Sequence, residues 1–488
     1  MSDSLHFAGL LLLSAAVILA ALLSNRLGER VRIPAPALML AAAAVLVQVV
    51  PALHHPSGKV VEELVTVALV LILFDGGMGT GWPAFRGSAR PIALVGVAGT
   101  FLTALGVAAF AHLVIGLDWY PAVLVATAVS PTDPAVVFSV LGQREVSGRS
   151  GTLLEGESGA NDPVGIALMA SLLTAGGLSG GAMGHVAVEF LLQMVIGAAV
   201  GVVGGKALLW TMRHVPLPGE GLYPLRTLAG ILLLFGAATL AHGSGFLAVF
   251  VAGILVGEAR APYKREIEHF HSALASMGEI LAFVVLGLTV HLGELASPDV
   301  WVPGLAIAVV LTVVVRPLAL EPLLAGSGLA RHEKTFVMFA GLKGAVPILL
   351  GSFIVGEGVP DSGRLYGIVI VVVVLSVVVQ GSLVPTVAGR LGVPMRVVEP
   401  EPWSLGVRLR DEPDGVHRLT VAAGSPAAGR RIEELDDLPE STWISFVVRR
   451  GQLVRVGGDT VLEEGDEALV LGEPEDEERL RGVFESPS

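Results

Sequence analysis

The stretch GESGANDPVGIAL at residues 156–168 places polar side chains inside one of the most apolar parts of the chain. Glu157, Ser158, Asn161 and Asp162 fall within two helical turns, and apolar residues follow directly. The apolar segment begins near residue 151, so a rise of about 1.5 Å per residue places Asp162 about 16 Å along a helix. Half of a membrane's hydrocarbon core is about 15 Å thick, and Asp162 is therefore expected near the midplane.

The composition identifies the chain as a membrane protein. Of its 488 residues 53% are hydrophobic and 15% are charged, whereas soluble domains are about 25% charged. The absence of cysteine excludes disulfides and thiolate metal sites. The net charge of −13 is uneven, because residues 397–488 hold 21 acidic and 10 basic residues. We expect a transmembrane domain at 1–396, a linker at 397–415 and an acidic cytoplasmic domain at 416–488, and such a tail argues against nucleic acid as a partner.

Apolar runs predict an all-α polytopic domain of about 13 transmembrane helices, including a retained first span. The runs lie near 5–23, 33–51, 60–75, 91–116, 120–141, 151–175, 185–212, 223–241, 244–258, 270–292, 300–323, 334–355 and 363–389. Alternate loops carry sixteen Lys and Arg residues and the intervening loops carry two. This bias predicts an inner (plasma) membrane protein with its N-terminus outside and its C-terminal domain in the cytoplasm.

Two further segments carry polar residues at the same depth. SPTDPAVV at 130–137 brackets Thr132 and Asp133 with prolines, and GLKGAVPI at 341–348 holds Lys343 between glycines. Proline removes a backbone donor, so both segments predict interrupted helices, which are tolerated at this depth only beside a cavity. Their equivalent positions, fifth and twelfth of thirteen, predict inverted repeats. Asp133 as the cap of a half-helix is the structural alternative. Lys206 and Arg316 are expected nearer helix ends or bundle seams, where they reach the surface or pair locally.

These motifs together resemble the NhaP-type monovalent cation:proton antiporters of the asparagine–aspartate subgroup. GESGANDPVGIAL resembles their asparagine–aspartate motif, SPTDPAVV their threonine–aspartate segment, and LILFDGGM at 71–78 the glycine pair of their third helix. The resemblance implies that Asp162 is the cation and proton carrier and that Asn161 is its neutral partner. It further implies that Thr132, Asp133 and Ser158 complete a shell around a monovalent cation.

GLKGAVPI resembles the family segment that usually carries arginine, where this chain has Lys343. The resemblance implies that Glu157 pairs with this basic residue. An arginine stays charged and binds a carboxylate through two hydrogen bonds, whereas a buried lysine readily loses its proton. The substitution therefore predicts a less rigid pair with Glu157 and an altered pH profile.

The tail resembles the C-terminal lobe of potassium-transport regulatory domains, the TrkA-C (RCK-C) type. The resemblance rests on LTVAAGSPAAGRRIEEL at 419–435 and on the segment 448–472. Short apolar runs, Gly-Asp turns and charged helical stretches predict a small α+β fold. No glycine-rich dinucleotide fingerprint precedes it, so the nucleotide-binding lobe is expected to be absent. The resemblance suggests a small regulatory ligand, such as a nucleotide.

The sequence thus predicts a transporter and not an enzyme, with no cofactor besides the transported K⁺ or Na⁺ and H⁺. Proton and cation competing for Asp162 predicts an electroneutral one-for-one exchange, and the regulatory tail favours K⁺ over Na⁺. The resemblance implies a homodimer in the lipid bilayer, whose helices 4–6 and 11–13 move against the rest. An RCK-regulated cation channel is the alternative, although no tandem carbonyl filter is apparent. A membrane sensor without transport would leave the interrupted helices unexplained.

Overall fold

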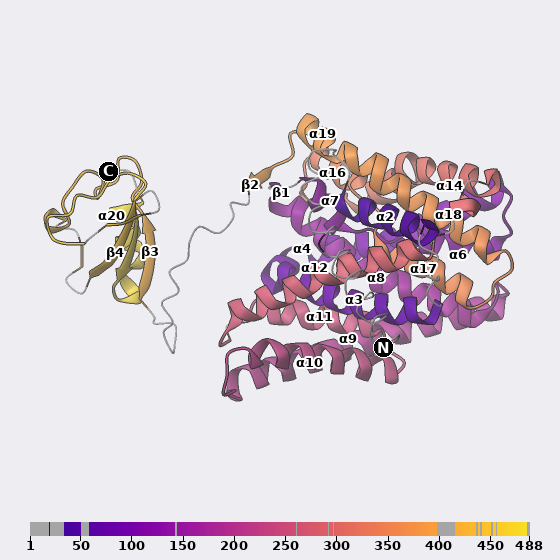
Figure 1. Ribbon diagram of the computed structural model, residues 1–488, viewed down its shortest axis with the longest axis horizontal. Helices are drawn as coiled ribbons and strands as arrows, with labels where there is room; N and C mark the ends of the chain where they lie inside the picture. The colour runs from indigo at the N-terminus through magenta and orange to yellow at the C-terminus, as the bar shows by residue number, and fades with distance from the viewer. Residues whose placement is uncertain are drawn as a thin grey trace. The chain divides into compact units, whose positions relative to one another are not determined.

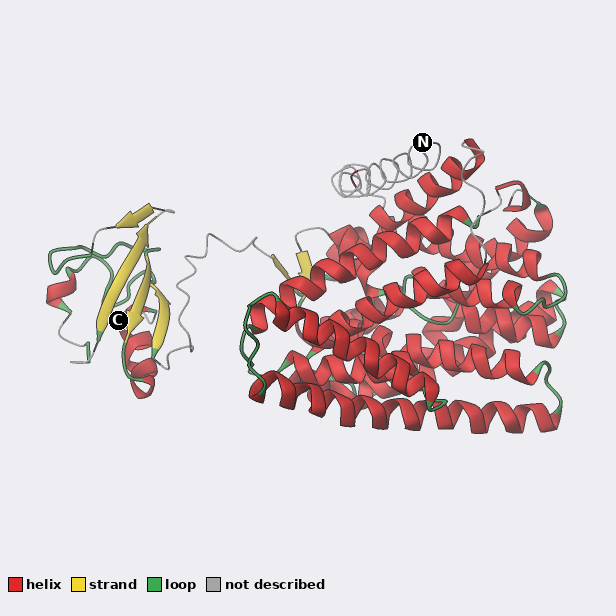
Figure 2. Cartoon of the chain, turned by 60° about the horizontal axis from the view of Figure 1, so that its bottom comes forward, coloured by secondary structure: helices red, strands yellow, loops and turns green. Residues whose placement is uncertain are grey.

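The computed structural model describes Leu19, residues 34–49, residues 58–397 without 142, 143, 260, 291 and 296, and residues 415–485 without 436, 437, 440, 441, 450, 451 and 455. The chain divides into two compact units, Met1–Val398 and Glu399–Ser488. The first unit is almost entirely helical and the second is built on a β-sheet (Figure 2).

The helices of the first unit pack in two groups. In the scaffold group, α3 packs against α11 and α12, α12 against α2, and α9 against α10 and α11. Its members are α2 (Ala35–Val49), α3 (Gly58–Thr80), α9 (Gly180–His214), α10 (Leu222–Leu240), α11 (Gly245–Gly257) and α12 (Lys264–Leu288). Figure 1 shows α9 and α10 at one edge of the unit, and α14, α18 and α19 at the opposite edge.

In the core group, α4 packs against α8, α5 against α6, and α18 against α14 and α17. Its members are α4 (Trp82–Ala93), η1 (Leu94–Ala98), α5 (Gly99–Phe110), η2 (Ala111–Ile115), α6 (Trp119–Ala128), α7 (Pro134–Leu141), α8 (Gly148–Ala175), α13 (Leu292–Leu295), α14 (Pro298–Val310), η3 (Leu311–Val315), α15 (Arg316–Leu323), α16 (Arg331–Phe339), α17 (Ala345–Gly356), α18 (Ser362–Leu375), η4 (Ser376–Gln380) and α19 (Gly381–Leu391). The elements η1 to η4 are π-helical turns within longer helices.

The predicted spans from residue 33 onward coincide with single helices or with consecutive helices, and the run at 5–23 lies outside the described residues apart from Leu19. Within the described part of the chain, six helical segments are long and apolar enough to cross a membrane. These are Arg86–Ile115, Gly180–His214, Leu222–Leu240, Lys264–Leu288, Pro298–Leu323 and Ser362–Leu391. The predicted interruptions are both present, between α6 and α7 and between α16 and α17, whereas the total of thirteen spans stays a prediction.

Two short strands connect distant loops of the first unit. β1 (Arg144–Val146) pairs in antiparallel fashion with β2 (Met395–Val397), and the backbone N–H of Ser147 donates to the carbonyl of Pro394 at 2.9 Å. The loop before α8 and the segment after α19 therefore lie at the same end of the helical unit.

The second unit confirms the predicted small α+β fold. Its antiparallel sheet has the order β3-β6-β4-β5, formed by β3 (Val416–Thr420), β6 (Glu467–Leu471), β4 (Trp443–Arg449) and β5 (Gln452–Val454). The 3₁₀ turns η5 (Ile432–Glu434) and η6 (Pro474–Asp476) and the helix α20 (Glu477–Phe484) complete the unit. Leu419, Val447, Val470, Leu480 and Phe484 are buried in one core between the sheet and α20.

Arg449 holds the turn before β6 by a forked contact with a buried carboxylate. Its Nε and Nη2 atoms donate to the two oxygens of Asp466 at 2.9 and 2.8 Å, and Nη1 donates to Glu463 at 2.7 Å. The hydrogen bond and charge of Asp466 raise the pKa of Arg449. A paired guanidinium is the arrangement that buried carboxylates require.

Two glycines allow the backbones of α3 and α11 to touch. A Cβ at Gly77 would lie 2.5 Å from the carbonyl oxygen of Phe250, and a Cβ at Gly253 would lie 2.5 Å from the carbonyl oxygen of Phe74. Real Cβ atoms do not approach that closely, so this helix crossing depends on the absence of side chains. Small residues at such contacts are typical of membrane helix packing.

We expect Gly77→Val to force α3 and α11 apart and to lower the stability of the purified protein by about 1–3 kcal/mol, the usual cost of overpacking. Gly79→Val is the matched control, because the space around Gly79 on the same helix is open. Thermal melting in detergent measures the difference, and equal melting temperatures for the two variants would contradict the prediction.

Candidate functional site

The two helix interruptions meet inside the core group. The first gap is residues 129–133, between α6 and α7, and the second gap is residues 340–344, between α16 and α17. The backbone N–H of Asp133 donates to the carbonyl of Leu342 at 2.8 Å, and this hydrogen bond joins the two gaps directly. The Nζ of Lys343 donates to the carbonyls of Ser130 and Pro131 at 3.0 and 3.1 Å. Because the interrupted helix leaves these carbonyls without helical partners, the ammonium group satisfies acceptors that would otherwise be buried and unpaired.

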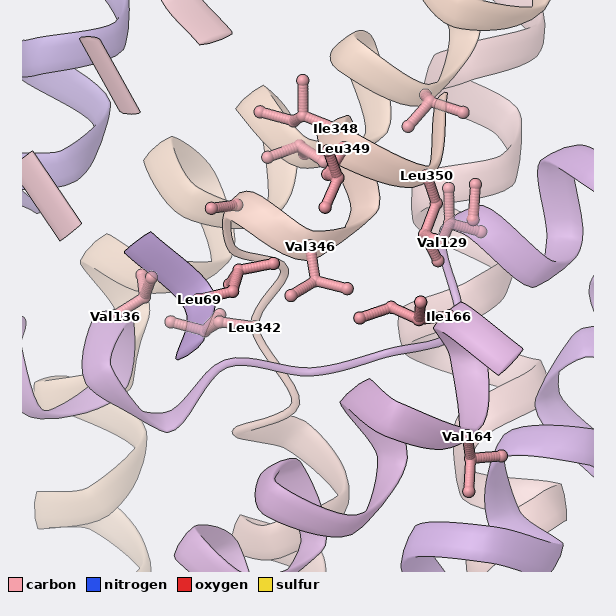
Figure 3. Packing of buried hydrophobic residues seen from close by; sticks show 14 of the residues in the cluster. Leu69, Val129, Val136, Val164, Ile166, Leu342, Val346, Ile348, Leu349 and Leu350 are labelled. Carbon is pink, nitrogen blue, oxygen red and sulfur yellow. The ribbon is translucent and has the colours of Figure 1, made fainter. Parts of the chain in front are cut away.

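The crossing is tight and is surrounded by apolar side chains. A Cβ at Gly344 would overlap the carboxylate of Asp133, so only glycine fits there. Figure 3 shows Val129 of the first gap near Leu350 of α17, and Leu342 of the second gap near Val136 of α7. Val129, Val136, Leu342 and Leu350 are all fully buried. The polar groups of the crossing therefore lie in an environment of low polarity.

The polar residues of α8 contact the first gap. The Nδ2 atom of Asn161 donates to the hydroxyl of Thr132 at 2.8 Å, and the backbone N–H of Thr132 donates to the Oδ1 atom of Asn161 at 3.3 Å. The hydroxyl of Thr132 donates in turn to Glu157 at 3.4 Å. Asn161 thus binds the interrupted helix through both ends of its amide, and its predicted place beside the site agrees with this geometry.

Asp162 lies at the middle of α8 and is 8% exposed. The hydroxyl of Ser158 donates to its Oδ2 atom over a long distance of 3.5 Å. The carboxylate also interacts electrostatically with Asp133 and with Lys343. No ion pair of Asp162 occurs among the described residues, so the carboxylate has acceptor capacity that the protein leaves unused.

The structure corrects the predicted partner of Glu157. Its carboxylate pairs with Arg316, whose Nη2 lies 2.8 Å from Oε1 and 3.1 Å from Oε2, and both side chains are at most 3% exposed. Lys343 instead binds backbone carbonyls, because the main-chain course of the second gap directs its side chain to the first gap. Of the two expectations for Arg316, reaching the surface or pairing locally, the structure shows a buried ion pair inside the core group.

Arg316 also satisfies the end of α16. Its Nε donates to the carbonyl of Met338 at 2.9 Å, and its Nη2 donates to the carbonyl of Val337 at 3.3 Å. A Cβ at Gly341 would overlap the guanidinium, so the glycine of the second gap provides the space for it. Arg316 thus replaces the helical donors that the interruption removes and neutralises Glu157 in the same position.

The predicted cation ligands Thr132, Asp133, Ser158 and Asp162 lie around this crossing and offer carboxylate, hydroxyl and carbonyl oxygens. Such ligands suit hard monovalent cations better than transition metals. Among the described residues, no group of three or more acidic or histidine side chains converges as a metal-binding site. The arrangement is therefore a cluster of oxygen groups in which neither Asp133 nor Asp162 has an ion pair among the described residues, while Asp133 caps α7 by accepting from the backbone N–H of Ala135 at 2.9 Å.

A further mid-membrane acid, Glu279, was missed in the sequence. It lies in α12, is half-buried, and interacts electrostatically with Asp133. The sequence could have indicated it, because Glu279 is the one acidic residue in the apolar run at 270–292. It lies near the middle of that run, as Asp162 does in its own. Glu279 thus brings a carboxyl group from the scaffold group towards the site of the core group.

A mid-membrane carboxylate beside two crossing helix interruptions is the architecture of secondary transporters. The chain belongs to the sodium/hydrogen exchanger family, because the model of the family's transmembrane region matches residues 13–389. The TrkA-C domain model matches residues 416–485. The resemblance read from the motifs is thereby confirmed.

Relatives and solved structures agree with this family. The chain is 33% identical to the K(+)/H(+) antiporter NhaP of Alkalimonas amylolytica over 83% of this chain and 71% of that protein. It is 31% identical to the K(+)/H(+) antiporter NhaP2 of Shewanella oneidensis over 97% of this chain and 82% of that protein. The fold resembles the sodium proton antiporter MjNhaP1 of Methanocaldococcus jannaschii at pH 8, with a TM-score of 0.66, 21% identity, and coverage of 77% of this chain and 97% of that one.

We expect Arg316→Met to destabilise the protein by about 3–5 kcal/mol, because it leaves the buried Glu157 carboxylate without a partner. Combining it with Glu157→Gln removes the unpaired charge and should recover part of the loss. Thermal melting of the purified variants measures both effects.

The control for this series is Arg331→Met, since Arg331 is exposed at the start of α16. If Arg316→Met melts with the control, or if the double variant is less stable than Arg316→Met, the ion pair does not have the role assigned to it.

Proposed function

We propose that this protein exchanges a monovalent cation for H⁺ across the membrane and that both ligands compete for Asp162. The observation that carries the proposal is the contrast between two acids on α8. Glu157 is neutralised by Arg316 at 2.8 Å, whereas Asp162 has one long hydrogen bond and, in the described structure, no ion pair. A bound cation or proton would supply the missing neutralisation.

The other site residues take supporting parts in this proposal. Thr132, Asp133 and Ser158 supply further cation ligands, partly through water, and Asn161 holds the interrupted helix beside the carrier. Lys343 is anchored on two carbonyls of the first interruption, next to the proposed cation ligands Thr132 and Asp133.

The proposed topology is that of an inner-membrane protein with thirteen spans arranged as inverted repeats. Its N-terminus lies outside, and its C-terminal domain lies in the cytoplasm. The two crossing interruptions support the repeat, since they occupy equivalent positions in the predicted series. The β1–β2 pairing supports the orientation, because it joins two of the arginine-bearing loops that the charge bias assigns to the cytoplasm. The proposed domains are the transmembrane domain at 1–396, the linker at 397–415 and the cytoplasmic regulatory domain at 416–488.

The transport motion in this proposal is a displacement of the core group against the scaffold group, with the scaffold forming a homodimer. The packing supports it, since the most extensive contacts of most helices lie within their own group, with α8 against α9 as the main exception. K⁺ is the proposed cation because the two relatives compared over most of the chain are named K(+)/H(+) antiporters. The family assignment disfavours the cation-channel alternative.

The tail is proposed to regulate exchange by binding a small ligand, such as a nucleotide. Measuring K⁺ against Na⁺ exchange in the same vesicles, with the full chain and with a chain lacking residues 400–488, tests the cation and the regulatory role together. A rate that is unchanged on removal of the tail, with and without added nucleotides, would contradict regulation.

We expect Asp162→Asn in proteoliposomes to abolish proton movement driven by a K⁺ or Na⁺ gradient, because the amide neither ionises nor attracts a cation as a carboxylate does. Asp118→Asn is the matched control, since Asp118 is exposed at the start of α6. Gradient-driven exchange by Asp162→Asn at the wild-type rate would refute the carrier assignment.

We expect the exchange rate to be independent of the membrane potential, because one cation for one proton moves no net charge. The measurement uses vesicles whose membrane potential is set by an ionophore that carries neither the exchanged cation nor H⁺. A pH-sensitive dye reports the exchange rate. A rate that changes steeply with voltage would show that the exchange is not one for one.

A further inference from the structure

A group of polar side chains in η3 and η4 forms hydrogen bonds at the second gap, and none of these residues belongs to the sequence motifs of the site. The hydroxyl of Ser376 accepts a hydrogen bond from the backbone N–H of Lys343 at 3.1 Å. The same hydroxyl donates to the Oε1 atom of Gln380 at 3.0 Å. Gln380 then donates through Nε2 to the carbonyl of Phe339. All these side chains are buried, with Ser376 5% and Gln380 7% exposed.

This chain of hydrogen bonds spans the interruption from one end to the other. Phe339 is the last residue of α16, and its carbonyl has lost the helical donor that a continuous helix would provide. Lys343 lies just before α17, and its N–H has lost the corresponding acceptor. The Ser376–Gln380 pair therefore takes the place of the missing helical turn.

The backbone geometry of η4 makes this contact available. Ser376 and Gln380 are the first and last residues of a π-helical turn, and a π turn is a frequent feature of functional sites. A second π turn, η3, faces it, and its Thr312 hydroxyl donates to the Oε1 atom of Gln380 at 3.3 Å. Thr312, Lys343, Ser376 and Gln380 also line a small cavity, so the network borders free space on one side.

We propose that Ser376 and Gln380 are positioning residues for the exchange, acting through Lys343. Their hydrogen bonds fix the main chain at Lys343, and Lys343 in turn holds the carbonyls of Ser130 and Pro131 beside Thr132 and Asp133. The inference rests on the proposed exchange at Asp162. It extends the site to η4, between α18 and α19, a segment that none of the sequence motifs includes.

The test compares Ser376→Ala, Ser376→Thr, Gln380→Met and Gln380→Glu with wild type by K⁺-driven proton movement in proteoliposomes, recorded over a range of K⁺ concentrations and pH. Loss of one or two buried hydrogen bonds corresponds to about tenfold in an equilibrium constant. We expect Ser376→Ala and Gln380→Met to raise the KM for K⁺ about tenfold and to shift the pH of half-maximal rate, with the maximal rate within about twofold of wild type.

Conservative variants distinguish positioning from bulk stability. Ser376→Thr keeps the hydroxyl and should restore the wild-type KM. Gln380→Glu keeps an acceptor for Ser376, and its neutral acid form still has an O–H donor for the Phe339 carbonyl, so we expect a smaller rise in KM than for Gln380→Met. Ser382→Ala is the matched control, because among the described residues the Ser382 hydroxyl bonds only to the nearby Val379 carbonyl, through an exposed hydrogen bond.

The outcomes separate this inference from the proposed function. If wild type moves no protons in response to any monovalent cation gradient, the proposed exchange itself is wrong. If wild type exchanges and Ser376→Ala has an unchanged KM and pH profile, or loses only maximal rate in proportion to folded protein, the positioning role is overturned. Should Gln380→Met fail to fold, the Ser376→Ala and Ser376→Thr pair decides the question alone.

Discussion

The backbone groups released by two interrupted helices impose the central constraint on this molecule. A hydrocarbon environment offers no water to replace lost helical hydrogen bonds, so each exposed N–H or C=O must find a partner within the protein. The carbonyls of Val337 and Met338 bind Arg316, and that of Phe339 binds Gln380. Across the crossing, the carbonyls of Ser130 and Pro131 bind Lys343, and the carbonyl of Leu342 binds the N–H of Asp133. The polar network of the site is therefore also what permits the helices to break.

The same network determines where charge stays uncompensated. Two cations and several carboxylates lie within a few residues of the crossing, and removing any of them from water is costly unless it is paired. Arg316 is committed to Glu157 and to two carbonyls, and Lys343 is committed to Ser130 and Pro131. Because both basic side chains are held in this way, neither forms an ion pair with Asp162 among the described residues, and this supports the proposal that a cation or a proton neutralises that carboxylate.

The sequence predicted those parts of the site that depend on one segment alone. Depth and proline placement were enough for the buried mid-helix position of Asp162 and for both gaps, because they follow from helix rise and backbone chemistry. The partner of Glu157 could not be obtained in this way, since Arg316 lies 159 residues further on and reaches Glu157 only through the packing of α15 against α16 and α5. Ser376 and Gln380 were equally hidden, because serine and glutamine in a membrane helix are ordinary packing residues.

The hydrogen bonds at the crossing join several helices of the core group. Asp133 is joined to the second gap through Leu342, Arg316 joins the end of α16 to Glu157 of α8, and Ser376 of η4 binds the backbone of Lys343. A ligand that shifts Asp133 must therefore shift these helices together or break buried hydrogen bonds. Because broken hydrogen bonds leave polar groups unpaired in a medium of low polarity, these contacts favour a joint displacement of the core helices, which is the motion that the proposed exchange needs.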